Sequence, residues 1–255
     1  MRASSLIALK TTLETLYDRY HRPLYRPIDP VEVVWEYADE RDQAIAGLWA
    51  ALFAWGRRSV SIQKARLLLK ALSPSPYAHL RSEKPLLVSF RHRTWTPEAI
   101  ALLWEKLRDL YGRHGSLHAF FCSYRERLWE GVAAFQTEIT RNAPTLRRYI
   151  GDLRKGSASK KLWLWLRWMI RKDLIDPGPW AHTFLPAHLY VPLDVHLLAW
   201  ARYHNLLSHS NANWKAVVAL TQVFREISPP DPLRYDFAIL TASSLGELYS
   251  IPSEE

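Results

Sequence analysis

The chain has little cysteine and little glycine, with one cysteine, Cys122, and nine glycines among 255 residues. A single thiol excludes a disulfide-stapled scaffold and a zinc site built from cysteines, and it is typical of a reducing, cytoplasmic compartment. The longest apolar run, residues 44–55, falls far short of the roughly 20 residues that a membrane-spanning helix needs. We therefore expect a soluble, cytoplasmic protein with no membrane partner.

Common catalytic motifs are missing as well. The ten histidines include no HExxH motif and no pair at a spacing typical of a metal site. The sequence also holds no glycine-rich phosphate loop, no dinucleotide-binding fingerprint and no GxSxG nucleophile elbow. These absences exclude most common enzyme classes, and we expect a protein that uses neither a metal ion nor a cofactor.

Positive charge is abundant and concentrated. The formal net charge is +9, and residues 141–161 hold seven basic residues against one acid, Asp152. A solvated basic face is one explanation. A cluster of this density in a chain with a pI near 9.7 favours a polyanionic partner, and nucleic acid is the most common one.

The hydrophobic pattern is helical almost throughout, and strand signals are nearly absent. Apolar residues recur every three or four positions in most segments, and residues 41–57 are apolar on all faces, which indicates a buried central helix. The predicted helices cover residues 6–20, 41–57, 59–72, 98–111, 116–142, 157–172, 192–207, 214–227 and 232–249. We expect one compact all-α domain over residues 1–255, a bundle of about nine helices in which two lobes can leave a cleft between them.

Lys160 stands at the start of the predicted helix 157–172. With Ser157 as the N-cap, Lys160 takes the third helical position. The positive end of the helix dipole and the neighbouring Lys155 and Lys161 then disfavour its ammonium form, which would lower its pKa and make it nucleophilic. The alternative, which spacing alone favours, is a phosphate-binding or solvated lysine.

Asp194 opens a second helix, in the segment VPLDVHLLAWARYHNLL. A capping role is the commonest one for an aspartate at such a position. The functional alternative is a carboxylate that faces a cleft and moves protons. We interpret His196 next to it as a structural histidine.

This second segment resembles the catalytic segment of helix–hairpin–helix DNA glycosylases, which begins with V-D-T-H-V-x-R, although the LPGVG-type hairpin that precedes it there is missing. The closer similarity is to archaeal 8-oxoguanine DNA glycosylases, a branch with an atypical hairpin. Their lysine motif Q-K-T-x-V-F-x-x-K is similar to residues 159–167, their aspartate motif I-P-x-D-x-R-V-A-R to residues 191–199, and their P-P-L-H-L-D-T-L-L-W to residues 231–240. Over nearly its full length, through pieces such as IAGLWAALFAWGRR and DPLRYDFA, the chain also resembles an uncharacterised bacterial family.

The resemblance implies a glycosylase-like fold with the catalytic segment in residues 157–246, and a DNA glycosylase with AP lyase activity. Lys160 would attack C1′ of an extruded nucleotide and Asp194 would assist, without any metal. The excised base would be an oxidised purine, and 8-oxoguanine is the expected one. The base-pocket candidates are Asp236, Trp55, Trp163 and Leu164. The candidates for phosphate contacts are Arg147, Arg148, Arg154, Lys155 and Lys161.

Several alternatives stay open at these positions. Asp236 can instead be a buried cap or a salt-bridge partner, and each tryptophan can be a core residue. Leu164 stands where the archaeal enzymes have an aromatic, and Leu240 where they have a tryptophan. For the whole chain, the competing functions are a non-catalytic nucleic-acid-binding protein on a glycosylase scaffold and a helical protein-interaction module. The expected partner is DNA with a damaged base, with a nucleoid location and no obligate protein partner.

Overall fold

The computed structural model describes residues 3–82, 84–207 and 211–249, and it is all-α, as the sequence predicts. Within these ranges there are α-helices and short 3₁₀ segments but no β-strand. The longer helices are α1 (Ala3–Tyr20), α2 (Glu40–Phe53), α3 (Arg58–Ala71), α5 (Pro97–His114), α7 (Leu128–Thr140), α9 (Lys160–Ile170), α10 (Val195–Tyr203), α11 (Trp214–Ile227) and α12 (Asp236–Ser244). The shorter ones are α4 (Pro76–Arg81), α6 (Leu117–Cys122) and α8 (Arg147–Ile150).

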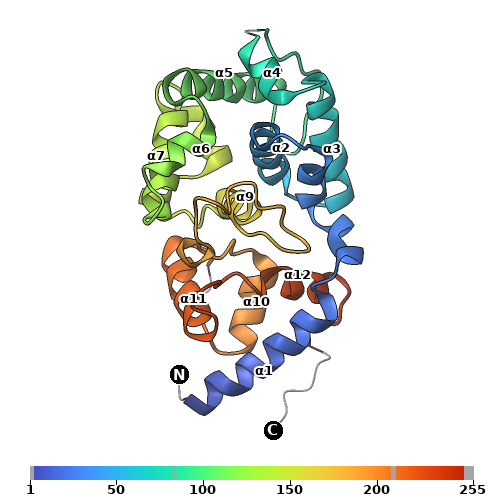
Figure 1. Cartoon of the computed structure of the whole chain (residues 1–255), viewed down its shortest axis with the longest axis vertical. Coiled ribbons are helices and arrows are strands. Elements are labelled where there is room, and N and C mark those ends of the chain that lie inside the picture. Colours follow the sequence, from blue (N-terminus) through green and yellow to red (C-terminus); the bar gives the residue numbers. More distant parts are fainter. Residues whose placement is uncertain (1–2, 83, 208–210, 250–255) are drawn as a thin grey trace.

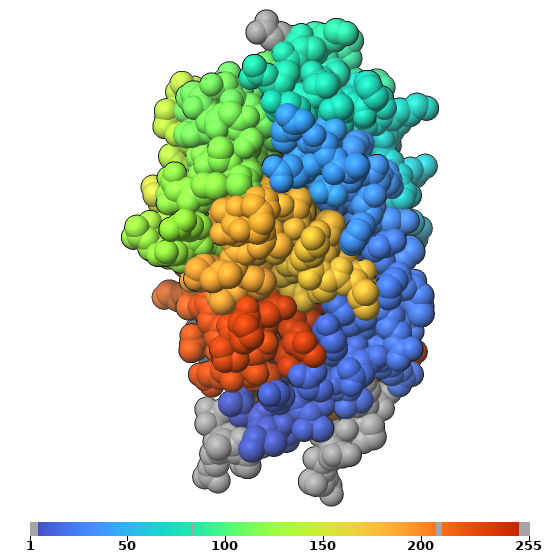
Figure 2. Space-filling view, viewed as in Figure 1, coloured from blue at the N-terminus to red at the C-terminus, as the bar shows by residue number. Residues whose placement is uncertain are grey.

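The helices form two groups with α9 between them (Figure 1). Helices α2 to α7 make the upper group in that view, whereas α1, α10, α11 and α12 make the lower one. Helix α9 packs on α2, and α1 packs along α12. The segment that follows α9 covers the middle of one face of the molecule, between the two groups (Figure 2).

Local sequence signals set several helix starts. Thr96 caps α5 by accepting a hydrogen bond from the Ala99 N–H at 3.3 Å, and Pro97 occupies the first helical position, as the Thr-Pro pair predicts. Asn213 caps α11 in the same way through the Ala216 N–H at 2.9 Å. Each cap satisfies one backbone N–H that has no partner within its own helix.

Two predicted helices end differently in the structure. The helix predicted over residues 116–142 is split into α6 and α7 by a turn at residues 123–127, and Gly131 then packs against the Phe121 ring, where a Cβ would lie 3.0 Å from the ring. Helix α2 stops at Phe53 rather than at residue 57, because the chain turns through Gly56, whose φ of +92° favours glycine. Neither break carries a proline, so periodicity alone does not reveal it.

The core is rich in tryptophan. Eight of the twelve tryptophans are less than 2% exposed: Trp49, Trp95, Trp104, Trp163, Trp165, Trp168, Trp180 and Trp200. Every residue of α2 from Ala44 to Phe53 is buried, as the apolar pattern predicts. Two thirds of the tryptophans therefore serve in core packing, and Trp55, at 51% exposed, is the most exposed of the others. Among the described helices, none combines the length and the apolar character that crossing a membrane requires.

Candidate active site

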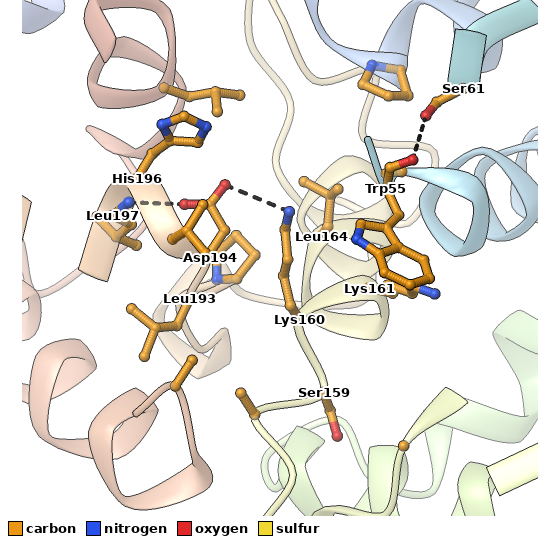
Figure 3. Close-up of a pocket in the computed structure, with 18 of the residues that line it drawn as sticks. Trp55, Ser61, Ser159, Lys160, Lys161, Leu164, Leu193, Asp194, His196 and Leu197 are labelled. Carbon is orange, nitrogen blue, oxygen red and sulfur yellow. Dashed lines mark hydrogen bonds and ion pairs between the residues drawn. The ribbon is translucent and has the colours of Figure 1, made fainter. Parts of the chain in front are cut away.

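Lys160 and Asp194 both line a cavity of about 750 Å³, and their side chains point toward each other (Figure 3). The cavity is lined by the α2–α3 junction, the residues before and at the start of α9, the start of α10, and α12. Lys160 Nζ lies 3.5 Å from Asp194 Oδ2, and the two side chains are 33% and 14% exposed. In Figure 3 Asp194 and His196 come from one side of the cavity, Trp55 and Ser61 from the other, and Lys160 extends between them. Two residues that are 34 positions apart in the sequence thus form one ion pair.

Helix α9 begins at Lys160 itself, so the prediction that Ser157 caps the helix and places Lys160 third was wrong. Ser157 instead pairs with Asn213 in an isolated β-bridge, and the Trp214 N–H donates to the Gly156 carbonyl at 2.9 Å. This pairing keeps the chain non-helical as far as Ser159, whose φ of +47° lies in the left-handed region. Lys160 therefore directly follows a constrained turn, and its side chain points into the cavity.

Gln136 of α7 holds that turn together. Its amide donates hydrogen bonds to the Ile150 carbonyl at 2.8 Å and to Ser159 Oγ at 2.9 Å, and its carbonyl accepts one from the Leu153 N–H at 2.8 Å. The side chain is only 3% exposed. One buried amide thus joins both ends of the segment that leads into Lys160.

Asp194 combines the two roles that the sequence left as alternatives. Oδ1 accepts a hydrogen bond from the Leu197 N–H at 2.8 Å, which caps α10. The other carboxylate oxygen faces Lys160. The cap fixes the carboxylate, because its position is tied to the first turn of the helix.

Lys161 is the lysine whose pKa the fold changes most clearly. Burial, and to a lesser degree the charge of Lys160, lower the pKa of Lys161 to about 8. Its Nζ lies 3.5 Å from the Tyr149 carbonyl and 6.0 Å from the centre of the Trp55 ring. Lys161 is one of the predicted phosphate contacts, and the structure places it in the cavity wall.

The structure brings some of the predicted base-pocket residues to the cavity and places another in the core. Trp55 and Leu164 line the cavity. Trp163 does not, because it is fully buried and stacks on Trp214 with a centroid distance of 5.9 Å. Successive helix residues point about 100° apart, so neighbours such as 163 and 164 face different sides. The prediction that Trp163 lies in the base pocket was wrong, because Trp163 is a core residue.

Asp236 lines the cavity and also forms a salt bridge with a buried arginine. Arg167 Nη1 donates to it at 2.6 Å, so the salt-bridge alternative is realised. Burial raises the pKa of Asp236 to about 6, and the Arg167 guanidinium opposes that rise. Arg167 is fully buried and also binds Asp29, at 2.9 Å, and Asp176, at 3.1 Å.

The predicted phosphate contacts have different environments. Arg148 lies at the cavity and is exposed, and Arg154 and Lys155 are exposed on the segment between α8 and α9. Arg147 is paired with Asp152 at 3.1 Å, which partly neutralises it.

Sequence reasoning missed several cavity residues. Asp29 and Arg58 line the cavity, as does His196, whose Nδ1 lies 2.9 Å from Ser243 Oγ. A usable signal for Arg58 was the segment 55–72, which has five basic residues and no acidic one. In the described part of the chain, no group of three or more His, Cys, Asp or Glu side chains is arranged to hold a metal ion.

Comparison with known proteins gives one match. The family model described as "Protein of unknown function (DUF2400)" matches residues 29–244. No curated protein and no solved structure matches the chain. Every residue that lines the cavity, from Asp29 to Leu240, lies within the matched region.

Proposed function

We propose, for a chain that belongs to the DUF2400 family of proteins of unknown function, that the cavity is the active site of a DNA glycosylase with AP lyase activity. The substrate is DNA with a damaged base, an oxidised purine such as 8-oxoguanine. The observation that carries this proposal is the pair of Lys160 and Asp194, held 3.5 Å apart by two separate helix starts. The proposal includes a nucleoid location in the cytoplasm.

The pair suits nucleophilic chemistry at a sugar carbon. Lys160 transfers a proton to Asp194, and the amine lone pair then forms a bond to C1′ while the bond from C1′ to the base breaks. The base leaves with that electron pair and takes up a proton. Opening of the sugar ring at O4′, with protonation of that oxygen, gives a Schiff base between Lys160 and C1′. Loss of a C2′ proton then breaks the C3′–O3′ bond and releases the phosphate, which nicks the strand.

The cavity has room for an extruded nucleotide. Its volume of about 750 Å³ falls in the range of about 300–1,000 Å³ that is usual for small-molecule sites. Trp55 offers an aromatic face and Leu164 an apolar one. An enzyme that acts on a base within a duplex must rotate the nucleotide out of the stack, at a cost of a few kcal/mol, so an apolar wall that receives the base supports the proposal.

A single-turnover assay on end-labelled duplexes tests the proposal. The duplexes carry 8-oxoguanine, uracil, hypoxanthine or no lesion, each with and without borohydride. We expect a nicked and trappable product on the 8-oxoguanine duplex, and its loss in Lys160→Ala with DNA binding retained. Trapping that survives in Lys160→Ala but is lost in Lys161→Ala would reassign the nucleophile to Lys161.

Salt-sensitive DNA binding without cleavage of any duplex would instead leave the non-catalytic nucleic-acid-binding alternative. DNA binding that does not respond to salt would favour the protein-interaction alternative.

A further inference from the structure

Basic residues from three distant segments meet beside the cavity, and two of these segments, the start of α3 and the turn at residues 92–95, lie outside the cluster that the sequence singled out. Gly56, whose neighbour is Arg57, lines the cavity, and a Cβ on Gly56 would lie only 2.0 Å from Arg93 Nη2. The Arg93 guanidinium also lies 5.9 Å from the centre of the Trp55 ring, whose other cationic neighbour is Lys161. The start of α3 and the turn at residues 92–95 therefore form one surface.

His92 lies next to this surface and close to its cations. Burial lowers the pKa of His92, and the positive charges of Arg93, Lys161 and Lys64 lower it further. His92 is fixed to the end of α2, with Nε2 2.8 Å from the Phe53 carbonyl. The three cations thus approach one buried ring from three different parts of the chain.

The same surface continues onto α8. Tyr149 donates a hydrogen bond to the Thr94 carbonyl at 3.0 Å and stacks on Trp95 with a centroid distance of 4.1 Å. Its neighbour Arg148 is exposed at the cavity. In Figure 3 Asp194 lies on the other side of the cavity from Trp55, so these cations and this carboxylate come from different sides of the cavity.

These cations have no acidic partners. In the part of the chain that the structure describes, no ion pair involves Arg57, Lys64 or Arg93, whereas Arg66 on the same helix pairs with Glu36 at 2.7 Å and with Glu32 at 3.4 Å. Like charges that gather without counter-charges repel one another in the folded state. Such an arrangement suits a ligand that supplies several negative charges in a row.

We infer that Arg57, Lys64 and Arg93, here named the α3 patch, bind consecutive phosphates of the nucleic acid strand whose nucleotide enters the cavity, and that this track continues to Arg148. The inference rests on the proposed function for the identity of the partner. Nucleic acid fits better than another polyanion because the exposed Trp55 ring lies among the cations, and basic grooves with aromatic faces are typical of single-strand contacts.

Binding measured against salt concentration tests the inference. The probe is a fluorescent duplex with a tetrahydrofuran abasic analogue, which the enzyme cannot cleave, titrated between 50 and 200 mM salt. For Arg57→Ala/Arg93→Ala we expect weaker binding and a plot of log K against log salt that is less steep by about 1.8, or about 0.9 for each phosphate that the variant no longer neutralises. The matched control is Arg66→Ala, which removes an arginine of α3 that already has acidic partners and should keep the wild-type slope.

Methylphosphonate substitution locates the contact. Neutral linkages placed next to the abasic analogue on its own strand should weaken wild-type binding and should weaken binding by the double variant less. A double variant with the wild-type slope, or one equally sensitive to every neutral linkage, overturns the inference. A wild-type chain that binds no DNA overturns it as well.

The two proposals fail separately, because the binding assay needs no turnover. Wild-type cleavage of a lesion duplex together with an unchanged slope in the double variant would reject the α3 patch alone. A reduced slope together with no cleavage of any duplex would reject the glycosylase chemistry and leave the patch as a nucleic-acid contact.

Discussion

Lys161 shows how surroundings rather than motif position set the charge of a residue. Lys160 and Lys161 are neighbours at the start of α9, yet Lys161 is folded into the cavity wall against the Tyr149 carbonyl and the Trp55 ring. Burial lowers its pKa to about 8. A measurable part of its population is therefore neutral near physiological pH, next to the lysine to which we assign the nucleophilic role.

The lowered pKa of Lys161 predicts how stability depends on pH. A lysine in the unfolded chain titrates near its ordinary pKa of 10.5 and the folded one near 8, so the unfolded state binds more protons between these values, and this residue makes stability rise with pH there. Lys161→Met should raise the free energy of unfolding at pH 7 by on the order of 1–2 kcal/mol, which allows for partial solvent exposure. Urea unfolding at pH 7 and pH 9.5 measures the effect. The same gain at both pH values would contradict it.

The candidate site was predictable from the sequence where a helix start identified the residue. Lys160 and Asp194 each open a helix, and the structure brings both to one cavity. Trp163 was misplaced because the apolar run at residues 162–166 gives no indication of which side of the helix faces a cavity. Arg93 and the residues near it were missed because they approach the cavity through long-range packing of the turn at residues 92–95 on α2, which no local pattern encodes.

At the level of elements, the cap of α10 gives the second prediction. Asparagine caps helices about as well as aspartate, so Asp194→Asn should keep the stability of the protein and lose the carboxylate that accepts the proton of Lys160. Asp194→Ala should lose both the helix cap and the carboxylate, and the missing cap should lower the free energy of unfolding by about 1 kcal/mol. Thermal unfolding and single-turnover cleavage of the two variants separate the roles. Equal destabilisation by both variants would show that the carboxylate, and not the cap, stabilises this region.

The turn before α9 gives the third prediction. Gln136→Leu leaves the Leu153 N–H without its hydrogen bond and releases the Ser159 hydroxyl, at a cost of about 1–3 kcal/mol. Because the same turn aims Lys160, we expect slower cleavage with little change in DNA affinity. Single-turnover rates and anisotropy titrations test this split.

The control for Gln136 is Thr137→Val on the same helix, whose hydroxyl bonds only to the Ala133 carbonyl within α7. It should leave both the rate and the affinity unchanged. A Gln136→Leu variant that loses affinity and rate in equal measure would assign Gln136 to the general fold alone.

The helices themselves were largely predictable, and their ends less so. Helix α11 runs over residues 214–227, the range that the hydrophobic pattern predicts. The last helix was predicted over residues 232–249, whereas α12 covers only Asp236–Ser244, because the preceding residues form turns in which Asp231 bonds to the Leu233 N–H and to Arg171. The bond from Arg171 comes from a side chain 60 positions away in the sequence, so periodicity cannot locate this helix start.

Across the whole molecule, buried charge joins the N-terminal and C-terminal parts. Arg167 of α9 binds Asp29 before α2, Asp176 after α9, and Asp236 of α12. Arg171 extends the cluster to Asp231 at 3.0 Å. A buried cluster of this kind adds little stability beyond a packed apolar core, but removing one partner leaves uncompensated charge.

The buried cluster gives the fourth prediction. Arg167→Met should lower the free energy of unfolding by about 3–5 kcal/mol at neutral pH, because the buried Asp29 and Asp236 lose their counter-charge and Asp176 keeps only Arg171. Burial already raises the pKa values of Asp176 and Asp236, and both rise further without the guanidinium, so the loss should shrink as the pH falls toward 5. Urea unfolding at pH 5 and pH 7.5 checks this. The control Arg19→Met removes an arginine from an exposed ion pair with Glu247 and should cost less than about 1 kcal/mol.

The arrangement of α1 along α12 has a consequence for synthesis on the ribosome. Helix α1 leaves the exit tunnel well before its packing partner α12, and the cavity takes lining residues from Asp29 through Leu240. Because domains fold as units while the chain is made, a nascent chain that already displays Lys160 still lacks Asp194 and the wall formed by α12. A product of interrupted translation would therefore carry the Lys160 amine without Asp194 and without the cavity wall formed by α12.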